Sequence, residues 1–248
     1  ARSYEEAVSI YEKYSQNMLG VITDVSFPEK NVKDKKAGLH LCSEIRRNDK
    51  FIPLIVVSTE EENRQIAEEL NAVFLNKMSK TLFMELREKI TDNFWFGDLI
   101  FFNPQTGVEE ARVHNLRSLQ DSIFKVSDEA LYYHVSRNNI SRWLYSRAMF
   151  PLAEFLKNIQ VEPGMSENMK NVRQIIFDAI VHYRKIKNRG IVAVFQRDRF
   201  DMYSNFARIG EGSLGGKGRG LAFLDAMIKR NESLDKFENV QIAIPRTV

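Results

Sequence analysis

The sequence predicts an α/β protein whose N-terminal part holds a parallel sheet, and three observations carry that prediction. Short apolar runs at 19–23, 53–58 and 72–76 alternate with segments of helical periodicity. Strands that alternate with helices are joined by right-handed crossovers, which makes their sheet parallel. The runs are apolar throughout rather than every second residue, as in strands whose sheet is covered by helices on both faces.

Helices are predicted before and after each of these strands. The first covers residues 3–14, where Ser3 is the predicted N-cap and Glu6, three residues later, would complete a capping box. A polar loop is expected over 28–38, ahead of the second helix. The remaining helices of this region are predicted over 38–48, 60–70 and 80–90.

The pattern changes after Asp92. An antiparallel hairpin is predicted over 98–115, with its turn at Pro104–Gly107. Two helical stretches follow, over 116–124 and 128–158. This part of the chain is therefore expected to be α+β and mostly helical.

A third segment begins at the break formed by Pro163–Gly164. It opens with a helix over 165–190 that ends at Gly190, and a strand is predicted over 191–198. A short strand, a glycine-rich loop over 210–220 and a last helix follow. The sequence thus predicts three domains, 1–92, 93–162 and 163–248.

The composition argues against several classes of protein. The net charge is +3, and its basic residues are scattered among acidic ones, so no concentrated basic face for nucleic acid is expected. No run of about 18 apolar residues predicts a membrane span. Cys42 is the single cysteine, which rules out a disulfide within the chain, and its amphipathic surroundings predict a core residue. Low cysteine use fits a cytoplasmic location.

Polar residues follow each of the three predicted strands. Asp24 follows the first strand, Ser58 ends the second and Lys77 follows the third. Because ligands of parallel sheets bind outside the carboxyl ends of the strands, we expect these side chains to meet at one edge. The lysine would favour an ionised carboxylate, and the hydroxyl could donate to an added phosphoryl oxygen.

These residues, in the segments ITDVSFP, PLIVVST and FLNK, resemble the receiver domain of bacterial response regulators, which has a flavodoxin-like sheet. The resemblance implies that Asp24 accepts a phosphoryl group with Mg²⁺ bound beside it. It implies that Ser58 and Lys77 bind the phosphoryl oxygens and that Phe74 is the aromatic switch residue. Ser26 would lend its backbone carbonyl to the metal.

The chain departs from that family in ways that bear on the site. The acidic pair that supplies most Mg²⁺ ligands in the family has no counterpart, and neither do the family's first strands. The family's usual proline after the lysine is Met78, and its usual alanine after the hydroxyl residue is Thr59. An exposed apolar edge would invite aggregation, so we expect residues upstream of Ala1 in a parent protein.

The glycine-rich stretch GEGSLGGKGRG is compatible with an anion site. Glycines let backbone N–H groups approach a phosphate, and a helix N-terminus and Lys217 add positive potential. Gly210, Gly212 and Gly215 match a dinucleotide fingerprint, but no clear ribose-binding acid follows. A plain turn into a helix remains the alternative.

The segment SLGGKGRGLAFL resembles the start of the nucleotide-binding domain of phosphoenolpyruvate synthases and pyruvate phosphate dikinases. The resemblance covers about residues 205–248 and implies an ATP-grasp domain in the intact parent protein. Lys217 would then bind an ATP phosphate, with Gly215 and Gly216 beside it. Since the remaining parts of such an enzyme have no counterpart here, the fragment itself is expected to lack synthase activity.

Together the resemblances imply a signal receiver that regulates a phosphoenolpyruvate synthase-like phosphotransferase. Its expected partners are a sensor histidine kinase or a small phosphodonor and the protein's own downstream catalytic domains, with neither nucleic acid nor membrane. The alternative is a degenerate receiver that serves as a non-catalytic scaffold or dimerisation module, and a homodimer stays open.

The middle segment contains His134, Ser136 and Arg137, which invite a catalytic interpretation. No nucleophile elbow accompanies them, so catalysis is not predicted. The arginines are expected to pair with carboxylates. A helical core is expected from Tyr132, Trp143, Leu144, Phe150, Leu152, Phe155 and Leu156.

Overall fold

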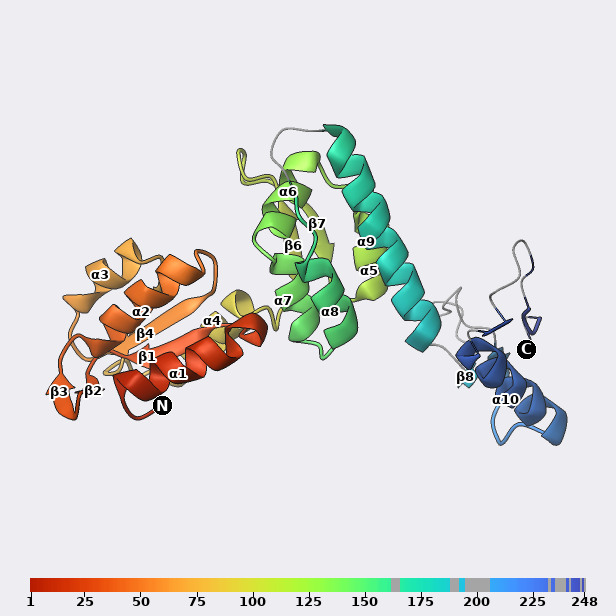
Figure 1. The fold of residues 1–248 in the computed structure, drawn as a ribbon, viewed down its shortest axis with the longest axis horizontal. Helices are drawn as coiled ribbons and strands as arrows, with labels where there is room; N and C mark the ends of the chain where they lie inside the picture. Colours follow the sequence, from red (N-terminus) through yellow and green to blue (C-terminus); the bar gives the residue numbers. More distant parts are fainter. Residues whose placement is uncertain are drawn as a thin grey trace. The chain divides into compact units, whose positions relative to one another are not determined.

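The computed structural model divides the chain into two compact units, Ala1–Arg173 and Gln174–Val248, which are considered separately (Figure 1). The sequence-based boundaries at residues 92 and 162 stay predictions. The residues that the structure describes are 1–161, 166–187, 192–194, 206–231, 233–234, 240, 242–245 and 247. Among them no helix is long and apolar enough to cross a membrane.

The first unit contains the predicted parallel sheet. Its strands are β1 (Val21–Asp24), β4 (Leu54–Ser58) and β5 (Val73–Asn76), in the order β1-β4-β5. Asp24 pairs with Val57, and Ser58 pairs with Asn76. A mixed α/β fold with a parallel sheet is therefore confirmed.

Helices cover both faces of this sheet (Figure 1). Val56 and Phe74 belong to a core formed with α1 (Tyr4–Tyr14), α2 (Ala37–Asn48) and α3 (Asn63–Glu69). Neighbouring residues of the same strands, Ile55 and Leu75, pack instead against α4 (Leu82–Asn93). This alternation explains why β4 and β5 are apolar throughout, because helices cover both of their faces, whereas Ile22 on the edge strand β1 is 44% exposed.

The start of α1 differs in one detail from its prediction. The Ser3 hydroxyl accepts from the N–H of Glu6 at 3.2 Å, as expected of an N-cap. The Glu6 carboxylate, however, accepts from the N–H of Arg2 at 2.5 Å. A short 3₁₀ turn, Ser15–Asn17, follows the helix.

The predicted loop over 28–38 is wrong in part, because a hairpin occupies much of it. Strands β2 (Phe27–Glu29) and β3 (Val32–Asp34) pair antiparallel across a two-residue turn. The turn residues, Lys30 and Asn31, have φ values of 49° and 63°, as tight hairpin turns of this kind require. A lysine is an unusual choice there, which is why the sequence gives only a weak hairpin signal.

The second predicted hairpin is confirmed. Strands β6 (Leu99–Phe102) and β7 (Glu109–Val113) pair antiparallel, with an irregularity in register at Phe101/Phe102. Helix α5 (Leu116–Ser122) follows, and the Asn115 side chain caps it by accepting from the N–H of Ser118 at 2.9 Å.

The stretch predicted over 128–158 is helical, but it is divided into three helices. They are α6 (Asp128–Ser136), α7 (Asn139–Tyr145) and α8 (Phe150–Lys157). Asn138 and Ala148 separate them with φ values of 57° and 56°, which no α-helix accommodates.

The predicted core of these helices is mostly right. Trp143, Leu144, Leu152 and Leu156 are buried, whereas Tyr132 is half-buried. Phe150 and Phe155 are 54% and 52% exposed, so their assignment to the core is wrong.

Arginines join the helical part of this unit to the turn after α2. The Arg142 guanidinium donates to Asp49 Oδ2 at 2.6 Å and to the Phe51 carbonyl at 3.2 Å. This confirms an arginine–carboxylate pair for Arg142. Arg147 instead donates to the backbone carbonyls of Trp95 and Gly97, at 2.8 and 2.7 Å.

Helix α9 (Ser166–Lys187) contains the boundary between the two units. In the second unit β8 (Val192–Val194) pairs parallel with β9 (Phe206–Arg208), and α10 (Gly216–Arg230) follows the glycine-rich loop. Gly190 and the rest of the strand predicted over 191–198 lie outside the described residues.

Candidate functional site at the carboxyl edge of the sheet

The structure brings Asp24 and Lys77 together. The Lys77 ammonium forms an ion pair with Asp24 Oδ2, although 53 residues separate the two in the sequence. Both side chains are partly open to solvent, with 43% of the Asp24 side chain and 36% of the Lys77 side chain exposed. An incoming molecule can therefore reach the carboxylate.

The backbone of β5 places Lys77. Its N–H donates to the carbonyl of Ser58 at 2.8 Å, which continues the strand pairing for one residue past β5. The Asn76 side chain accepts from the N–H of Met78 at 2.8 Å and donates to Glu61 at 2.8 Å. These bonds hold the turn after β5, so Lys77 leaves the sheet at a defined point.

Ser58 lies at the same edge on the middle strand, and it is only 5% exposed. Its Oγ accepts from the N–H of Glu60 and from Asn63 Nδ2, both at 3.1 Å. These bonds use the lone pairs of the oxygen and leave its proton to donate. Asp24 on β1 pairs with Val57 on β4, and Ser58 is the next residue of β4. Asp24 and Ser58 therefore lie at the carboxyl ends of adjacent strands.

The backbone around Asp24 is held tightly by α2. A Cβ atom added at Gly38 would lie 1.9 Å from the Asp24 carbonyl oxygen, and the Gly38 N–H donates to the Val25 carbonyl at 2.9 Å. Only glycine fits this approach. The sequence analysis did not identify Gly38. A glycine in the first turn of a helix lowers helix propensity, and its presence there could have indicated a close backbone contact.

Ser26 contacts Asp24 through its backbone. The Ser26 N–H donates to Asp24 Oδ1 at 3.4 Å, and the Ser26 hydroxyl is buried without a hydrogen-bond partner. The acid side chain is thus oriented from one side by this turn and from the other by Lys77.

Phe74 lies within the core rather than at the surface. It is 7% exposed, and the Arg64 guanidinium lies 4.7 Å from the centre of its ring. The ring therefore packs under α3, on the strand that ends beside Lys77.

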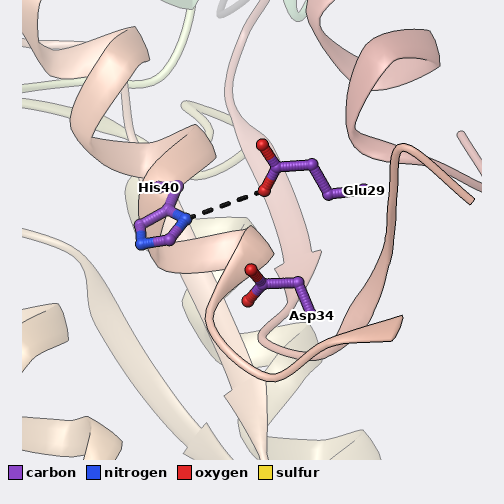
Figure 2. Close-up of side chains that lie close together, drawn as sticks. All are labelled: Glu29, Asp34 and His40. Carbon is purple, nitrogen blue, oxygen red and sulfur yellow. Dashed lines mark ion pairs between the residues drawn. The ribbon is translucent and has the colours of Figure 1, made fainter. Parts of the chain in front are cut away.

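Metal-ligating side chains gather at a different place. In the described part of the chain, the one group of three or more such side chains with converging ligand atoms is Glu29, Asp34 and His40 (Figure 2). Asp24 does not belong to this group.

The Asp24–Lys77 pair contributes little to the stability of the fold. Ion pairs this exposed contribute roughly 0–1 kcal/mol to folding. The edge thus brings together a carboxylate and an ammonium group, with the Ser58 hydroxyl on the middle strand.

The glycine-rich segment begins α10. Gly215 is the N-cap residue, with an extended backbone, and Gly216 and Lys217 are the first two helical residues. A Cβ atom added at Gly215 or Gly216 would meet nothing within 4 Å, so the backbone there is open to approach. Gly210 and Gly212 have φ values of 91° and 98°, which favour glycine.

His134 is a core residue. It is 1% exposed and lies among the rings of Phe101, Phe102 and Tyr133, with the Asn139 side chain 3.1 Å from its Nδ1. Burial lowers its pKa from 6.5 to about 4. Cys42 is likewise fully buried, and burial raises the pKa of its thiol to about 12, so it stays protonated.

Comparisons with protein-family models, with curated proteins and with solved structures found no significant match.

Proposed function

We propose that residues 1–92 form a flavodoxin-like receiver that accepts a phosphoryl group on Asp24. One observation carries the proposal: the Lys77 ammonium pairs with the Asp24 carboxylate at the carboxyl edge of a parallel sheet. The resemblance of ITDVSFP, PLIVVST and FLNK to receiver domains supports the same assignment.

Each side chain has a defined role in the proposed transfer. A carboxylate oxygen of Asp24 forms a bond to phosphorus while the bond from phosphorus to the donor breaks, and the donor keeps that electron pair. Lys77 then shifts from the carboxylate toward the negative phosphoryl oxygens. Ser58 donates its hydroxyl proton to one of those oxygens.

Mg²⁺ fits this edge as an accessory ion. It prefers oxygen ligands and keeps several waters, so the half-exposed Asp24 carboxylate and the Ser26 carbonyl would be its protein ligands. The ion would neutralise negative charge on the transferred group.

The experiment is phosphorylation by a small donor. The full-length protein, incubated with acetyl phosphate and Mg²⁺, should gain the mass of one phosphoryl group, and the Asp24→Asn variant should gain none. If wild type gained no phosphoryl group, or if the Asp24→Asn variant were modified equally, Asp24 would not be the phosphoryl acceptor.

The regulatory part of the proposal extends to the rest of the parent protein. A cytoplasmic sensor histidine kinase or small phosphodonor would modify Asp24, and the new charge would shift the population of surface conformations that involve Phe74. The target would be an ATP-dependent enzyme similar to phosphoenolpyruvate synthase. Lys217→Ala in that intact enzyme should weaken ATP binding, with Gly215 and Gly216 lining the same phosphate site.

A second candidate function is a non-catalytic dimerisation module, and the surface of α4 favours it. None of the residues of α4 is buried, and Met78, Phe83 and Met84 are 75%, 86% and 73% exposed. A second copy of the chain could cover these side chains. Light scattering of wild type and Phe83→Glu would distinguish a dimer that this surface forms from a monomer.

A further inference from the structure

We propose that Glu29, Asp34 and His40 form a binding site for a divalent transition-metal ion of the Zn²⁺ type. The inference is independent of phosphorylation at Asp24. Ligand atoms of the three side chains lie within 4.8 Å of one another, and His40 Nδ1 is 3.9 Å from Glu29 Oε2 (Figure 2).

The three ligands come from three elements. Glu29 ends β2, Asp34 ends β3, and His40 lies in the first turns of α2. Figure 2 shows both carboxylates directed toward the space beside the imidazole ring. The site therefore exists only when the hairpin is folded against the helix.

The hairpin register explains why the two carboxylates share a face. Phe27 pairs with Asp34 and Glu29 pairs with Val32, and paired residues of a hairpin point to the same side. Lys33 pairs with Pro28 between them and points to the opposite side. The lysine charge is thus directed away from the carboxylates, although it lies between them in the sequence.

The geometry needs little adjustment to hold an ion. Bonds of about 2.1 Å from Zn²⁺ to nitrogen and oxygen place its ligand atoms at most about 4.2 Å apart. Since the present atoms lie within 4.8 Å, small side-chain rotations suffice. Asp34 is already oriented, because its Oδ1 accepts from the N–H of Lys36 at 2.5 Å.

The donor set selects the class of ion. An imidazole with two carboxylates suits Zn²⁺ and other divalent first-row transition metals, whereas Mg²⁺ and Ca²⁺ prefer ligand sets made only of oxygen atoms. Exposure of 56% for the His40 side chain and 29% for that of Glu29 leaves room for water as the remaining ligand.

A bound ion would stabilise the β2–β3 hairpin. Each strand of this hairpin has three residues, and short two-stranded hairpins are marginally stable in water. Ligands on both strands and on α2 would link the hairpin to the helix whose Gly38 packs on the Asp24 backbone.

Titration of the full 248-residue chain with ZnCl₂ by calorimetry tests the site. We expect wild type to bind one ion and His40→Gln and Glu29→Gln to lose roughly tenfold or more in affinity. His114→Gln is the matched control, because the exposed His114 lies 2.8 Å from Asp98 Oδ2 but no third ligand joins them in the described part of the chain. Its affinity should equal that of wild type.

Trypsin provides a second readout. The hairpin and the turn after it contain Lys30, Lys33, Lys35 and Lys36, and ZnCl₂ should slow cleavage there in wild type but not in His40→Gln. Equal Zn²⁺ affinity in His40→Gln and His114→Gln, or no binding by wild type, would overturn the proposal. Loss of Zn²⁺ binding in Asp24→Asn would overturn it too, by placing the ion at the sheet edge.

Discussion

At the scale of single residues, the approach of Gly38 to the Asp24 carbonyl is the most restrictive contact near the candidate site. Replacing a helical glycine with alanine normally stabilises a helix by up to about 1 kcal/mol. Gly38→Ala should instead destabilise by about 1–3 kcal/mol, because the new methyl group would overlap the Asp24 carbonyl oxygen. Urea unfolding measures this difference.

A second glycine provides the control. Gly220 lies inside α10, and a Cβ atom there would meet nothing within 4 Å. Gly220→Ala should be neutral or stabilising. If both variants behaved alike, the close contact at Gly38 would not constrain the fold.

His134 should make stability depend on pH. Its pKa in the folded protein is about 4, below the 6.5 of the unfolded chain, so the unfolded state binds a proton first. The stabilising contribution is therefore complete above pH 6.5 and is lost as the pH falls toward 4. The full decrease in the free energy of unfolding amounts to roughly 3 kcal/mol.

Urea midpoints at pH 7 and pH 5 provide the measurement. His134→Gln should flatten the decrease between them, because it removes the buried imidazole. The same decrease in wild type and His134→Gln would show that His134 does not cause it.

At the scale of elements, the sequence predicted the three strands and the edge they share better than the segments between them. Continuous apolar runs predicted the three strands, and the polar residues just after them marked the carboxyl edge. The β2–β3 hairpin was missed because its turn uses Lys30 and Asn31 at positive φ, and the breaks at Asn138 and Ala148 were missed for the same reason. Local sequence indicates such backbone conformations poorly when glycine is absent.

The two candidate sites also differ in how far the sequence could predict them. The pairing of Asp24 with Lys77 follows from strand order alone, so the sequence could predict it. The contact of Gly38 and the meeting of His40 with Glu29 depend on how α2 packs against a hairpin that the sequence did not reveal.

The link between α7 and the turn after α2 gives a prediction at this scale. Arg142→Met would leave Asp49 and the Phe51 carbonyl without the guanidinium that now binds them. We expect a loss of about 2 kcal/mol in unfolding free energy, because the arginine side chain is only 9% exposed.

The matched surface variant is Arg112→Met. Arg112 pairs with Glu109 at 2.6 Å, and both side chains are more than 40% exposed. Arg112→Met should lower the free energy of unfolding by no more than about 1 kcal/mol. Equal losses of unfolding free energy in the two variants would contradict a structural role for the Arg142–Asp49 pair.

At the scale of the whole molecule, the unit Ala1–Arg173 contains the proposed phosphoryl-accepting sheet edge and the helical segment, and the glycine-rich loop lies in the second unit. Arg142 and Arg147 attach the helical segment to the turns that follow α2 and α4. A charge added at Asp24 could thus bias conformations within Ala1–Arg173, which forms one compact unit.

The most direct measurement is the position of the phosphoryl group after treatment with acetyl phosphate and Mg²⁺, found by peptide mass spectrometry. The account predicts a label on Asp24 that is strongly reduced in Lys77→Met and unchanged in Lys80→Met, a nearby lysine outside the ion pair. A label on another residue, or full labelling of Asp24 in Lys77→Met, would contradict it.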